Sequence, residues 1–257
     1  MSKIIAVANQ KGGVGKTTTQ VNLSACVAAE GKRVLSVDLD PQANASSGLG
    51  VAGEPGKTVY DVLSGGARVS ECIVKTPVEA LELLPSDIRL AGAEIELVAA
   101  EGREYILREA LMPLRERYDY IFIDCPPSLG LLTLNALCAA DRVVIPIQCE
   151  YYALEGVGQL MNTVQRVQRG LNPHLDIEGV VLTMMDGRTN LGIQVAQEVK
   201  KHFRQKVYGA IIPRNVRLSE APSHGLPINL YDARSAGAQA YADLAEEFIE
   251  RSEGESR

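Results

Sequence analysis

The ten residues NQKGGVGKTT (9–18) constrain the fold of this chain more than any other segment. They hold three glycines and directly follow the apolar run KIIAVA (3–8). A helical stretch, 16–30, begins at the end of the same loop and is followed by Gly31, a residue type common at helix ends. A strand, a glycine-rich loop and a helix in this order predict a P-loop, the phosphate-binding loop of nucleotide-binding α/β proteins.

The chemistry of such a loop assigns a role to each residue type. Backbone N–H groups of residues 12–16 would surround phosphate oxygens, and the following helix would direct its positive end at them. Lys16 would reach the outer phosphates, and the Thr17 hydroxyl would ligate Mg²⁺. The alternative is a glycine-rich turn that binds nothing, but the strand before the loop and the helix after it favour a nucleotide site.

The loop departs from the usual Gly-x-x-x-x-Gly-Lys-Ser/Thr pattern at its start. Gln10 stands where the first glycine would be, and Lys11 follows it. The site therefore has a second lysine close to Lys16. One phosphate loop by itself does not explain why two lysines are present.

Acidic residues at the ends of two other predicted strands complete the expected site. The segment YIFID (120–124) ends in Asp124, which would hold Mg²⁺ through water. The segment VDLDPQ (37–42) carries Asp38 and Asp40, which would share one face of an extended strand. One of this pair would serve the metal, and the other would orient an attacking water. Each acid also has a simpler explanation, as a strand-end cap or as the start of an Asp-Pro turn.

The remaining sequence predicts an α/β fold with a predominantly parallel, twisted sheet and helices on both faces. Apolar strand candidates alternate with longer helical stretches, which is typical of such sheets. No repeat and no linker is evident, so we expect a single domain over 1–251 and a short disordered tail over 252–257. A segment rich in Gly, Pro and Ser, 52–66, predicts a surface loop around a short helix. Further strands are expected at 33–40, 118–124, 141–147, 177–186 and 207–212, and helices at 154–169, 190–203 and 237–251.

Composition disfavours several classes of protein. With a net charge of −6 and no Trp, the chain lacks both a global basic character and an aromatic surface for single-stranded nucleic acid. The five cysteines form no Cys-x-x-Cys pair and the three histidines lie far apart, so no zinc or iron–sulfur site is expected. The N-terminus lacks signal-peptide features, and the best candidate for a membrane span, 129–147, carries Asn135, Asp141 and Arg142. We therefore expect a cytoplasmic protein.

Several segments together resemble the ParA/Soj family of chromosome-partitioning ATPases. A loop with the additional lysine is shared by a wider deviant Walker A superfamily that includes MinD and the nitrogenase iron protein. The segments after this loop occur in fewer families, and they favour the ParA/Soj family. The resemblance extends over nearly the whole chain. The segments are KGGVGKTT (11–18), DLDPQ (38–42), IDCPPS (123–128), EYYALEG (150–156) and IPRNVRLSEAP (212–222).

The resemblance implies a role for the second lysine. In this superfamily the matching residue crosses a dimer interface and contacts the partner's phosphates, so Lys11 is expected to make formation of a homodimer depend on ATP. Asp40 is expected to position the hydrolytic water, while Asp38, Asp124 and Thr17 are expected around Mg²⁺. No arginine or glutamine finger is evident in the chain, so intrinsic hydrolysis should be slow. The family's nucleotide contacts fall on Lys11, Gly12, Gly13, Val14, Gly15, Lys16, Thr17 and Thr18, with Pro213, Arg214 and Asn215 on the adenine side.

A basic segment late in the chain predicts a DNA-binding face. Residues 186–217 carry seven basic and two acidic side chains, a net charge of +5 in a chain whose total is −6. A lysine-rich helix face is more often merely solvated, and the resemblance is what favours nonspecific double-stranded DNA. It also implies a ParB-type centromere-binding partner that stimulates hydrolysis, and a location on the nucleoid. The expected DNA contacts are Arg188, Lys200, Lys201, Arg204 and Arg217.

Two other functions are compatible with a P-loop of this kind. A MinD-like membrane-cycling ATPase would need a basic amphipathic C-terminal helix, whereas 237–257 carries two arginines and six acids. No membrane partner is therefore expected. A small-molecule kinase or ligase would need neither a lysine that crosses a dimer interface nor a basic segment. The sequence thus favours a partitioning ATPase over both alternatives.

Overall fold

The computed structural model describes residues 2–150, 153–186 and 189–254. Within this part of the chain the strands are β1 (Lys3–Val7), β2 (Val34–Asp38), β3 (Val74–Lys75), β4 (Leu81–Leu84), β5 (Tyr120–Asp124), β6 (Arg142–Gln148), β7 (Asp176–Met185) and β8 (Val207–Pro213). They form one sheet in the order β3-β4-β2-β5-β1-β6-β7-β8, in which only β3 runs antiparallel to its neighbour. The predicted α/β fold with a predominantly parallel sheet is confirmed.

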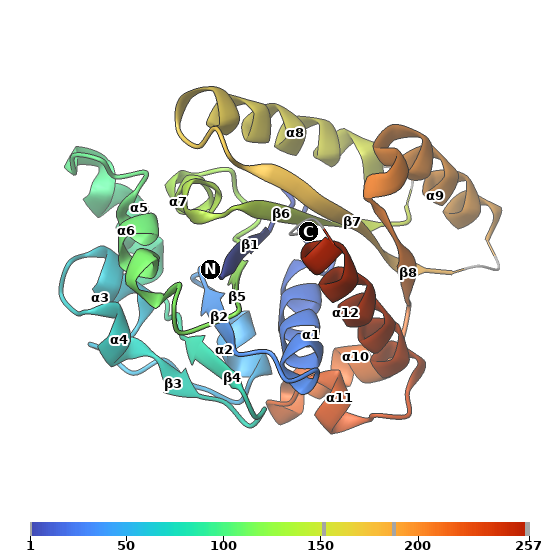
Figure 1. Ribbon diagram of the computed structural model, residues 1–257, viewed down its shortest axis with the longest axis horizontal. Helices are drawn as coiled ribbons and strands as arrows, with labels where there is room; N and C mark the ends of the chain where they lie inside the picture. Colours follow the sequence, from blue (N-terminus) through green and yellow to red (C-terminus); the bar gives the residue numbers. More distant parts are fainter. Residues whose placement is uncertain (1, 151–152, 187–188, 255–257) are drawn as a thin grey trace.

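Helices cover both faces of this sheet, as Figure 1 shows for α8 (Ala153–Gly170) on one side and α1 (Lys16–Ala29) and α12 (Ala236–Gly254) on the other. Alternate residues of β1 point to opposite cores: Ile4 and Ala6 join one, and Ile5 and Val7 join the other. The helices are α1 (Lys16–Ala29), α2 (Asn44–Gly48), α3 (Val59–Leu63), α4 (Val69–Cys72), α5 (Leu90–Glu96), α6 (Ile106–Leu111), α7 (Leu131–Ala139), α8 (Ala153–Gly170), α9 (Asn190–Phe203), α10 (Val216–Glu220), α11 (Ile228–Tyr231) and α12 (Ala236–Gly254), with short 3₁₀ turns at Leu97–Ala99, Met112–Leu114, Arg204–Lys206 and Ala221–His224.

The register of the central strands brings their polar ends together. Asp124, the last residue of β5, lies opposite Val7 of β1 and opposite Asp38 of β2. All three strands are parallel, so their carboxyl ends meet at one edge of the sheet, where ligands bind in open α/β folds. The glycine-rich loop leaves β1 at this edge. The fold therefore places the loop beside the acids that the sequence predicts as its partners.

Two boundaries differ from the prediction. Strand β2 ends at Asp38, so Asp40 lies beyond the strand and the two acids do not share one extended face. Helix α12 continues to Gly254, and Ser252 is buried with its hydroxyl donating to Glu178 Oε1 at 3.0 Å. Residues 252–254 therefore belong to the helix and not to a tail, because this turn packs against the sheet.

Strand β3, at one edge of the sheet, and its neighbour β4 were not predicted from the sequence. Strand β3 has two residues and β4 has four, which is too short for a clear hydrophobic pattern. No helix in the described residues has both the length and the apolar character needed to cross a bilayer.

Candidate nucleotide-binding site

The glycine-rich loop wraps around the start of α1. Gly13 has a φ of 72° and Gly15 a φ of 85°, both in the left-handed region that favours glycine. A Cβ at Gly12 or Gly13 would have no described atom within 4 Å other than those of the glycine itself and its two neighbours in the chain. The backbone of the loop thus borders open space, as a cradle for phosphate requires.

Lys16 lies under this loop with little exposure to solvent. Its side-chain Nζ donates to the carbonyl of Lys11 at 3.2 Å, across the loop. Burial lowers the pKa of Lys16, and the nearby Asp124 carboxylate opposes that shift. A buried ammonium group with one carbonyl acceptor is poorly solvated, and bound phosphate oxygens would provide the missing partners.

Thr17 and Asp124 form the second part of the site. The Thr17 hydroxyl donates to Asp124 Oδ2 at 2.7 Å, whereas the buried Oδ1 has no hydrogen-bond partner. Burial, together with repulsion from Asp38, holds the pKa of Asp124 well above its usual range. A hydroxyl and a carboxylate supply the hard oxygen atoms that Mg²⁺ prefers, so these residues fit that ion.

The carboxylates present would leave part of the coordination shell of Mg²⁺ to other ligands. No group of three or more His, Cys, Asp or Glu side chains among the described residues is arranged to hold a metal. Such a site is typical of Mg²⁺ bound through one or two protein oxygens, with phosphates and water completing the shell. The ion would there neutralise charge on the phosphates.

Asp38 and Asp40 lie next to this site but are held by their own loop. The Asp38 carboxylate is fully buried, and burial raises its pKa to about 6. It accepts hydrogen bonds from the backbone of Asp40 and from Ser46, so both of its oxygens already have donors. The Asp40 carboxylate accepts the Gln42 N–H at 2.9 Å. The roles of Asp38 near the metal and of Asp40 near water stay predictions.

The predicted adenine-side residues line a hollow beside the loop. This hollow has a volume of about 350 Å³. The sequence missed the contribution of β7, whose Thr183 hydroxyl donates to the carbonyl of Val14 at 2.8 Å. It also missed Tyr241 of α12, which approaches the site only through tertiary packing. The lining consists of Gly15, Thr18, Thr183, Met184, Ile212, Pro213, Arg214, Asn215, Leu218, Ser219, Pro222 and Tyr241.

Lys11 differs from Lys16 in its surroundings. Its side chain is 33% exposed, and its Nζ lies 4.0 Å from Glu150 Oε2, at the limit of an ion pair. Glu150 also lies 3.5 Å from a guanidinium nitrogen of Arg214. These loose contacts leave the Lys11 ammonium accessible for a phosphate outside its own loop.

The predicted DNA contacts do not form one face. Arg188 lies outside the described residues. Lys200 and Lys201 are in the last turn of α9, at the edge of the sheet where β8 begins, whereas Arg217 in α10 follows the other end of β8. Helix α9 has 14 residues and is therefore about 20 Å long. Its length separates Lys200 and Lys201, in its last turn, from Arg217 by most of the length of the neighbouring strands.

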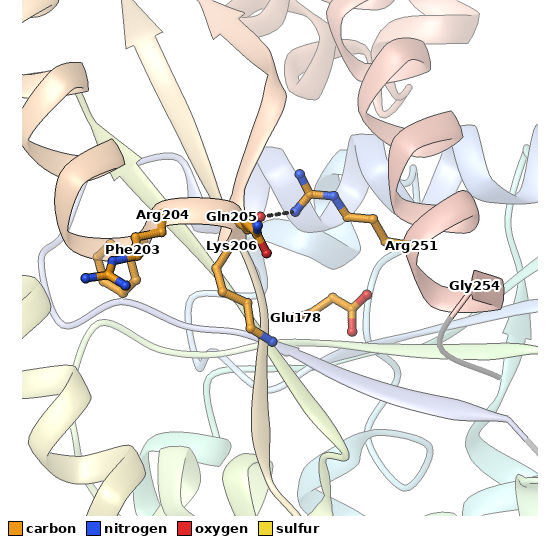
Figure 2. Close-up of a pocket in the computed structure, with 7 residues that line it drawn as sticks. All are labelled: Glu178, Phe203, Arg204, Gln205, Lys206, Arg251 and Gly254. Carbon is orange, nitrogen blue, oxygen red and sulfur yellow. Dashed lines mark hydrogen bonds between the residues drawn. The ribbon is translucent and has the colours of Figure 1, made fainter. Parts of the chain in front are cut away.

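Arg204 marks the edge that is remote from the phosphate loop. It lines a hollow of about 700 Å³ at the start of β8, together with Lys206 and, from α12, Arg251 (Figure 2). Of the predicted DNA contacts that the structure describes, Arg204 lines this hollow, Lys200 and Lys201 lie in the helical turn before it, and Arg217 lies in α10, beyond the other end of β8.

A strand, a glycine-rich loop with two lysines, and a threonine bonded to a buried aspartate at the carboxyl edge of a parallel sheet define the P-loop NTPase class. Comparison with family models agrees, since an AAA domain model matches residues 2–177.

Similar proteins show to which family of P-loop NTPases the chain belongs. The chain is 65% identical over 248 residues to the sporulation initiation inhibitor protein Soj of Bacillus subtilis (strain 168), covering 96% of this chain and 98% of that protein. It is 55% identical over 252 residues to the chromosome partitioning protein ParA of Caulobacter vibrioides (strain NA1000 / CB15N), covering 97% and 94%.

Among solved structures, a cobyrinic acid a,c-diamide synthase from Mycobacterium smegmatis with bound ADP and magnesium is similar. It has a TM-score of 0.87 and 39% identity, covering 99% of this chain and 97% of that one. From these similarities, above all the 65% identity, the chain belongs to the Soj/ParA family of chromosome-partitioning ATPases.

Proposed function

We propose that this chain is an ATP-dependent partitioning switch, in which ATP and Mg²⁺ build a dimer that binds DNA. The observation that carries the proposal is the unsatisfied polar chemistry at the carboxyl edge of the sheet. Lys16 is buried with a single carbonyl acceptor, and Asp124 Oδ1 is buried without a partner. Phosphate oxygens and Mg²⁺ complement these two groups.

Hydrolysis would use the residues around this pair. Thr17 and Asp124 would hold the ion, and the loop N–H groups with Lys16 would stabilise the charge that develops on the transferred phosphoryl group. Asp40, on the loop after β2, would orient the attacking water. The reaction converts ATP and water to ADP and phosphate, and it would be slow without a partner.

Lys11 would make the dimer depend on the nucleotide. Its ammonium is accessible and has only a 4.0 Å contact with Glu150. A triphosphate at an interface between two copies attracts a cation from the other copy, and ADP, with one phosphate fewer, attracts it less. ATP would therefore favour the dimer, and hydrolysis would weaken it.

DNA binding would use basic side chains that the dimer doubles. Arg217 is half exposed, and its ion pairs with Glu220 and Asp232 are at the surface, where such pairs contribute little and can exchange for phosphate. Lys200, Lys201 and Arg204 would add contacts from the far end of α9. Two copies on one duplex release more counterions than one, so affinity rises steeply with dimer formation.

A ParB-type partner bound to a centromere would stimulate hydrolysis and release the dimer from the nucleoid. The relatives named chromosome partitioning protein ParA and chromosome-partitioning ATPase Soj support a role in partitioning.

The test is binding to a nonspecific duplex at several salt concentrations with ATP, with ADP and without nucleotide. We expect salt-sensitive binding only with ATP, and a loss of at least tenfold in affinity in the Arg188→Ala/Arg217→Ala variant. Lys57→Ala is the matched control, because Lys57 is an exposed lysine in the loop before α3, paired only with the nearby Glu54. Equal binding in all nucleotide states would contradict the switch.

The similarity to a cobyrinic acid a,c-diamide synthase supports a second candidate, a small-molecule ligase. The two functions differ in what stimulates ATP hydrolysis. A rise with DNA and a ParB-type protein supports partitioning, whereas a rise with cobyrinic acid supports the ligase.

A further inference from the structure

The loop that follows β2 is closed by a single buried carboxylate. Asp38 Oδ2 accepts hydrogen bonds from both the backbone N–H and the hydroxyl of Ser46, each at 2.7 Å. Asp38 Oδ1 accepts the backbone N–H of Asp40 at 3.2 Å. These three bonds tie both ends of the segment 38–46 to one side chain, and Asp40 lies within that segment.

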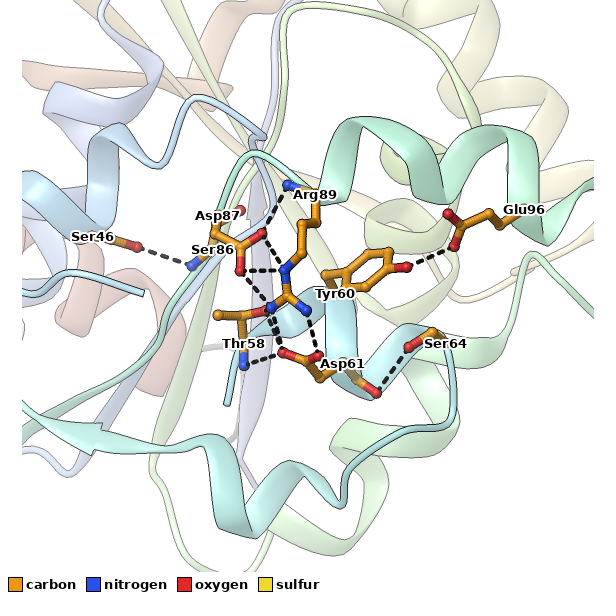
Figure 3. Close-up of polar contacts among 9 residues, drawn as sticks. All are labelled: Ser46, Thr58, Tyr60, Asp61, Ser64, Ser86, Asp87, Arg89 and Glu96. Carbon is orange, nitrogen blue, oxygen red and sulfur yellow. Dashed lines mark hydrogen bonds and ion pairs between the residues drawn. The ribbon is translucent and has the colours of Figure 1, made fainter. Parts of the chain in front are cut away.

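The hydroxyl of Ser46 has a second role in the same place. Ser46 is 1% exposed, and its Oγ accepts the backbone N–H of Ser86 at 3.1 Å (Figure 3). One hydroxyl therefore donates to Asp38 and accepts from the loop that follows β4. With the backbone bond included, Ser46 connects the end of β2 to the end of its neighbouring strand.

The loop that carries Ser86 is itself firmly anchored. The Arg89 guanidinium donates to both oxygens of Asp61, at 2.9 and 2.8 Å, and to Asp87 at 2.6 Å (Figure 3). A Cβ at Gly53 would lie only 2.3 Å from the Ser86 carbonyl oxygen, so the two backbones are in close contact there. Ser46 thus links the Asp38–Asp40 loop to a rigid part of the fold.

This link ends next to the reaction centre. Asp38 is paired with Asp124 in the register of β2 and β5, and Asp124 binds the Thr17 hydroxyl. A small movement of the Asp38 carboxylate would therefore displace Asp40 relative to the phosphate loop. Errors of about 1 Å in the placement of a catalytic group lower rates by roughly a hundredfold.

We propose that Ser46 is a positioning residue for ATP hydrolysis, which holds Asp38 and through it the loop that presents Asp40. This inference rests on the proposed role of Asp40. Among the described residues Ser46 makes no hydrogen bond to the phosphate loop. Its hydroxyl bonds to Asp38 and Ser86, its N–H donates to Asp38, and its carbonyl accepts from Leu49 and Val51. Its effect should therefore fall on the rate of hydrolysis and not on nucleotide affinity.

The experiment measures kcat, KM for ATP and ADP affinity in Ser46→Ala, at a temperature where melting curves show each variant folded. We expect kcat to fall about tenfold, with KM and ADP affinity within twofold of wild type. Ser47→Ala is the matched control, because Ser47 is on the same helix but exposed, and its hydroxyl donates only to the carbonyl of Ala43. It should keep wild-type kcat.

A double-mutant cycle separates positioning from general loosening of the structure. If Ser46 acts through Asp38, Ser46→Ala should lower kcat less than twofold in an Asp38→Asn background. Should Ser46→Ala fail to fold, Ser46→Cys carries the same test, since it keeps the size and backbone bond but is a weak donor. A wild-type kcat in the folded Ser46 variant would overturn the inference, as would an undiminished loss in the Asp38→Asn background.

Asp40→Ala, measured in parallel, distinguishes a failure of the proposed role of Ser46 from a failure of the proposed role of Asp40. If Asp40→Ala hydrolyses ATP at the wild-type rate, the proposed role of Asp40 is wrong, and with it the basis for Ser46. If Asp40→Ala is inactive while Ser46→Ala is unimpaired, only the role of Ser46 is wrong.

Discussion

Two clusters in this molecule each join a cation to acidic side chains, and they differ in how completely their polar atoms are paired. In the phosphate-loop cluster, Lys16 has one carbonyl acceptor, and Asp124 has one oxygen bound to Thr17 and one without a partner. In the second cluster, Arg89 donates to both oxygens of Asp61. The first cluster is buried, whereas the Arg89 side chain is 35% exposed.

The pKa shifts of the two clusters follow the same division. Burial lowers the pKa of Lys16 and raises that of Asp124, so both shifts favour the neutral forms. Burial opposes ionisation of Asp61 as well, but hydrogen bonds from Arg89 prevail and lower its pKa. Hydrogen bonds to Asp61 also raise the pKa of Arg89. Buried charge that is only partly paired thus marks the ligand site, and charge whose oxygens all have donors marks the structural one.

The largest expected effect is from Lys16→Ala. Because Lys16 would contact phosphate and is buried at a cost to the free protein, its loss should reduce ATP hydrolysis at least a hundredfold, about 2.7 kcal/mol in the barrier, without lowering the free energy of unfolding. Hydrolysis assays and urea unfolding without nucleotide measure the two quantities. A clear loss of stability with intact hydrolysis would reverse the assignment of the clusters.

Asp61→Ala should show the opposite pattern. It removes the acceptor for Arg89 and for the N–H and hydroxyl of Thr58, and should lower the free energy of unfolding by about 2 kcal/mol. ATP affinity should stay within twofold of wild type. Urea unfolding and nucleotide titration check both, and a tenfold loss of affinity would show that this cluster belongs to the ligand site.

Asp124→Asn tests the partly paired carboxylate of the phosphate-loop cluster. Without nucleotide and Mg²⁺ it should raise the free energy of unfolding by about 1 kcal/mol, since a neutral amide removes a buried charge and can still accept from Thr17. The same variant should lose Mg²⁺-dependent hydrolysis. An unchanged or lower stability would mean that the carboxylate is already well paired in the free protein.

The pH dependence of stability should differ at Asp61. Because its pKa is lower in the folded than in the unfolded protein, where it is about 3.9, the ionised form stabilises the fold above that value. This contribution is lost as the pH falls through the folded-state pKa. The difference in unfolding free energy between wild type and Asp61→Asn should therefore be constant from pH 7 to about 5 and shrink below about 4. A constant difference down to pH 3 would contradict the assigned shift.

The smallest effect is expected at an exposed pair. Lys57 and Glu54 lie 3.2 Å apart with more than half of each side chain exposed. Lys57→Ala should change the free energy of unfolding by less than about 0.5 kcal/mol. A larger change in urea unfolding would show that pairing and not burial decides the energetics of such clusters.

Much of the site was predictable because its signals are local. Gly13 and Gly15 take the positive φ angles that the loop needs, and Lys16 and Thr17 follow them directly on α1. The acid at the end of YIFID is recognisable because Asp124 directly follows a run of apolar residues, beside a glycine-rich loop that calls for a metal ligand. These features depend on neighbours in sequence and on the rules of a parallel sheet.

Other features have no local signal. Met184 and Tyr241 approach the nucleotide hollow from β7 and α12, at places that only packing determines. The basic residues of 186–217 look like one patch in sequence, yet α9 carries Lys200 away from Arg217.

The sequence by itself determined the strand–loop–helix unit, the alternation of strands and helices and the acids at strand ends, because backbone geometry and burial act over a few residues. Only the tertiary structure decided that Asp38 lies opposite Asp124 and that Ser46 joins Asp38 to Ser86. Those contacts link residues up to 86 positions apart in the chain. Strand order and register, set by the packing of the whole sheet, bring them together.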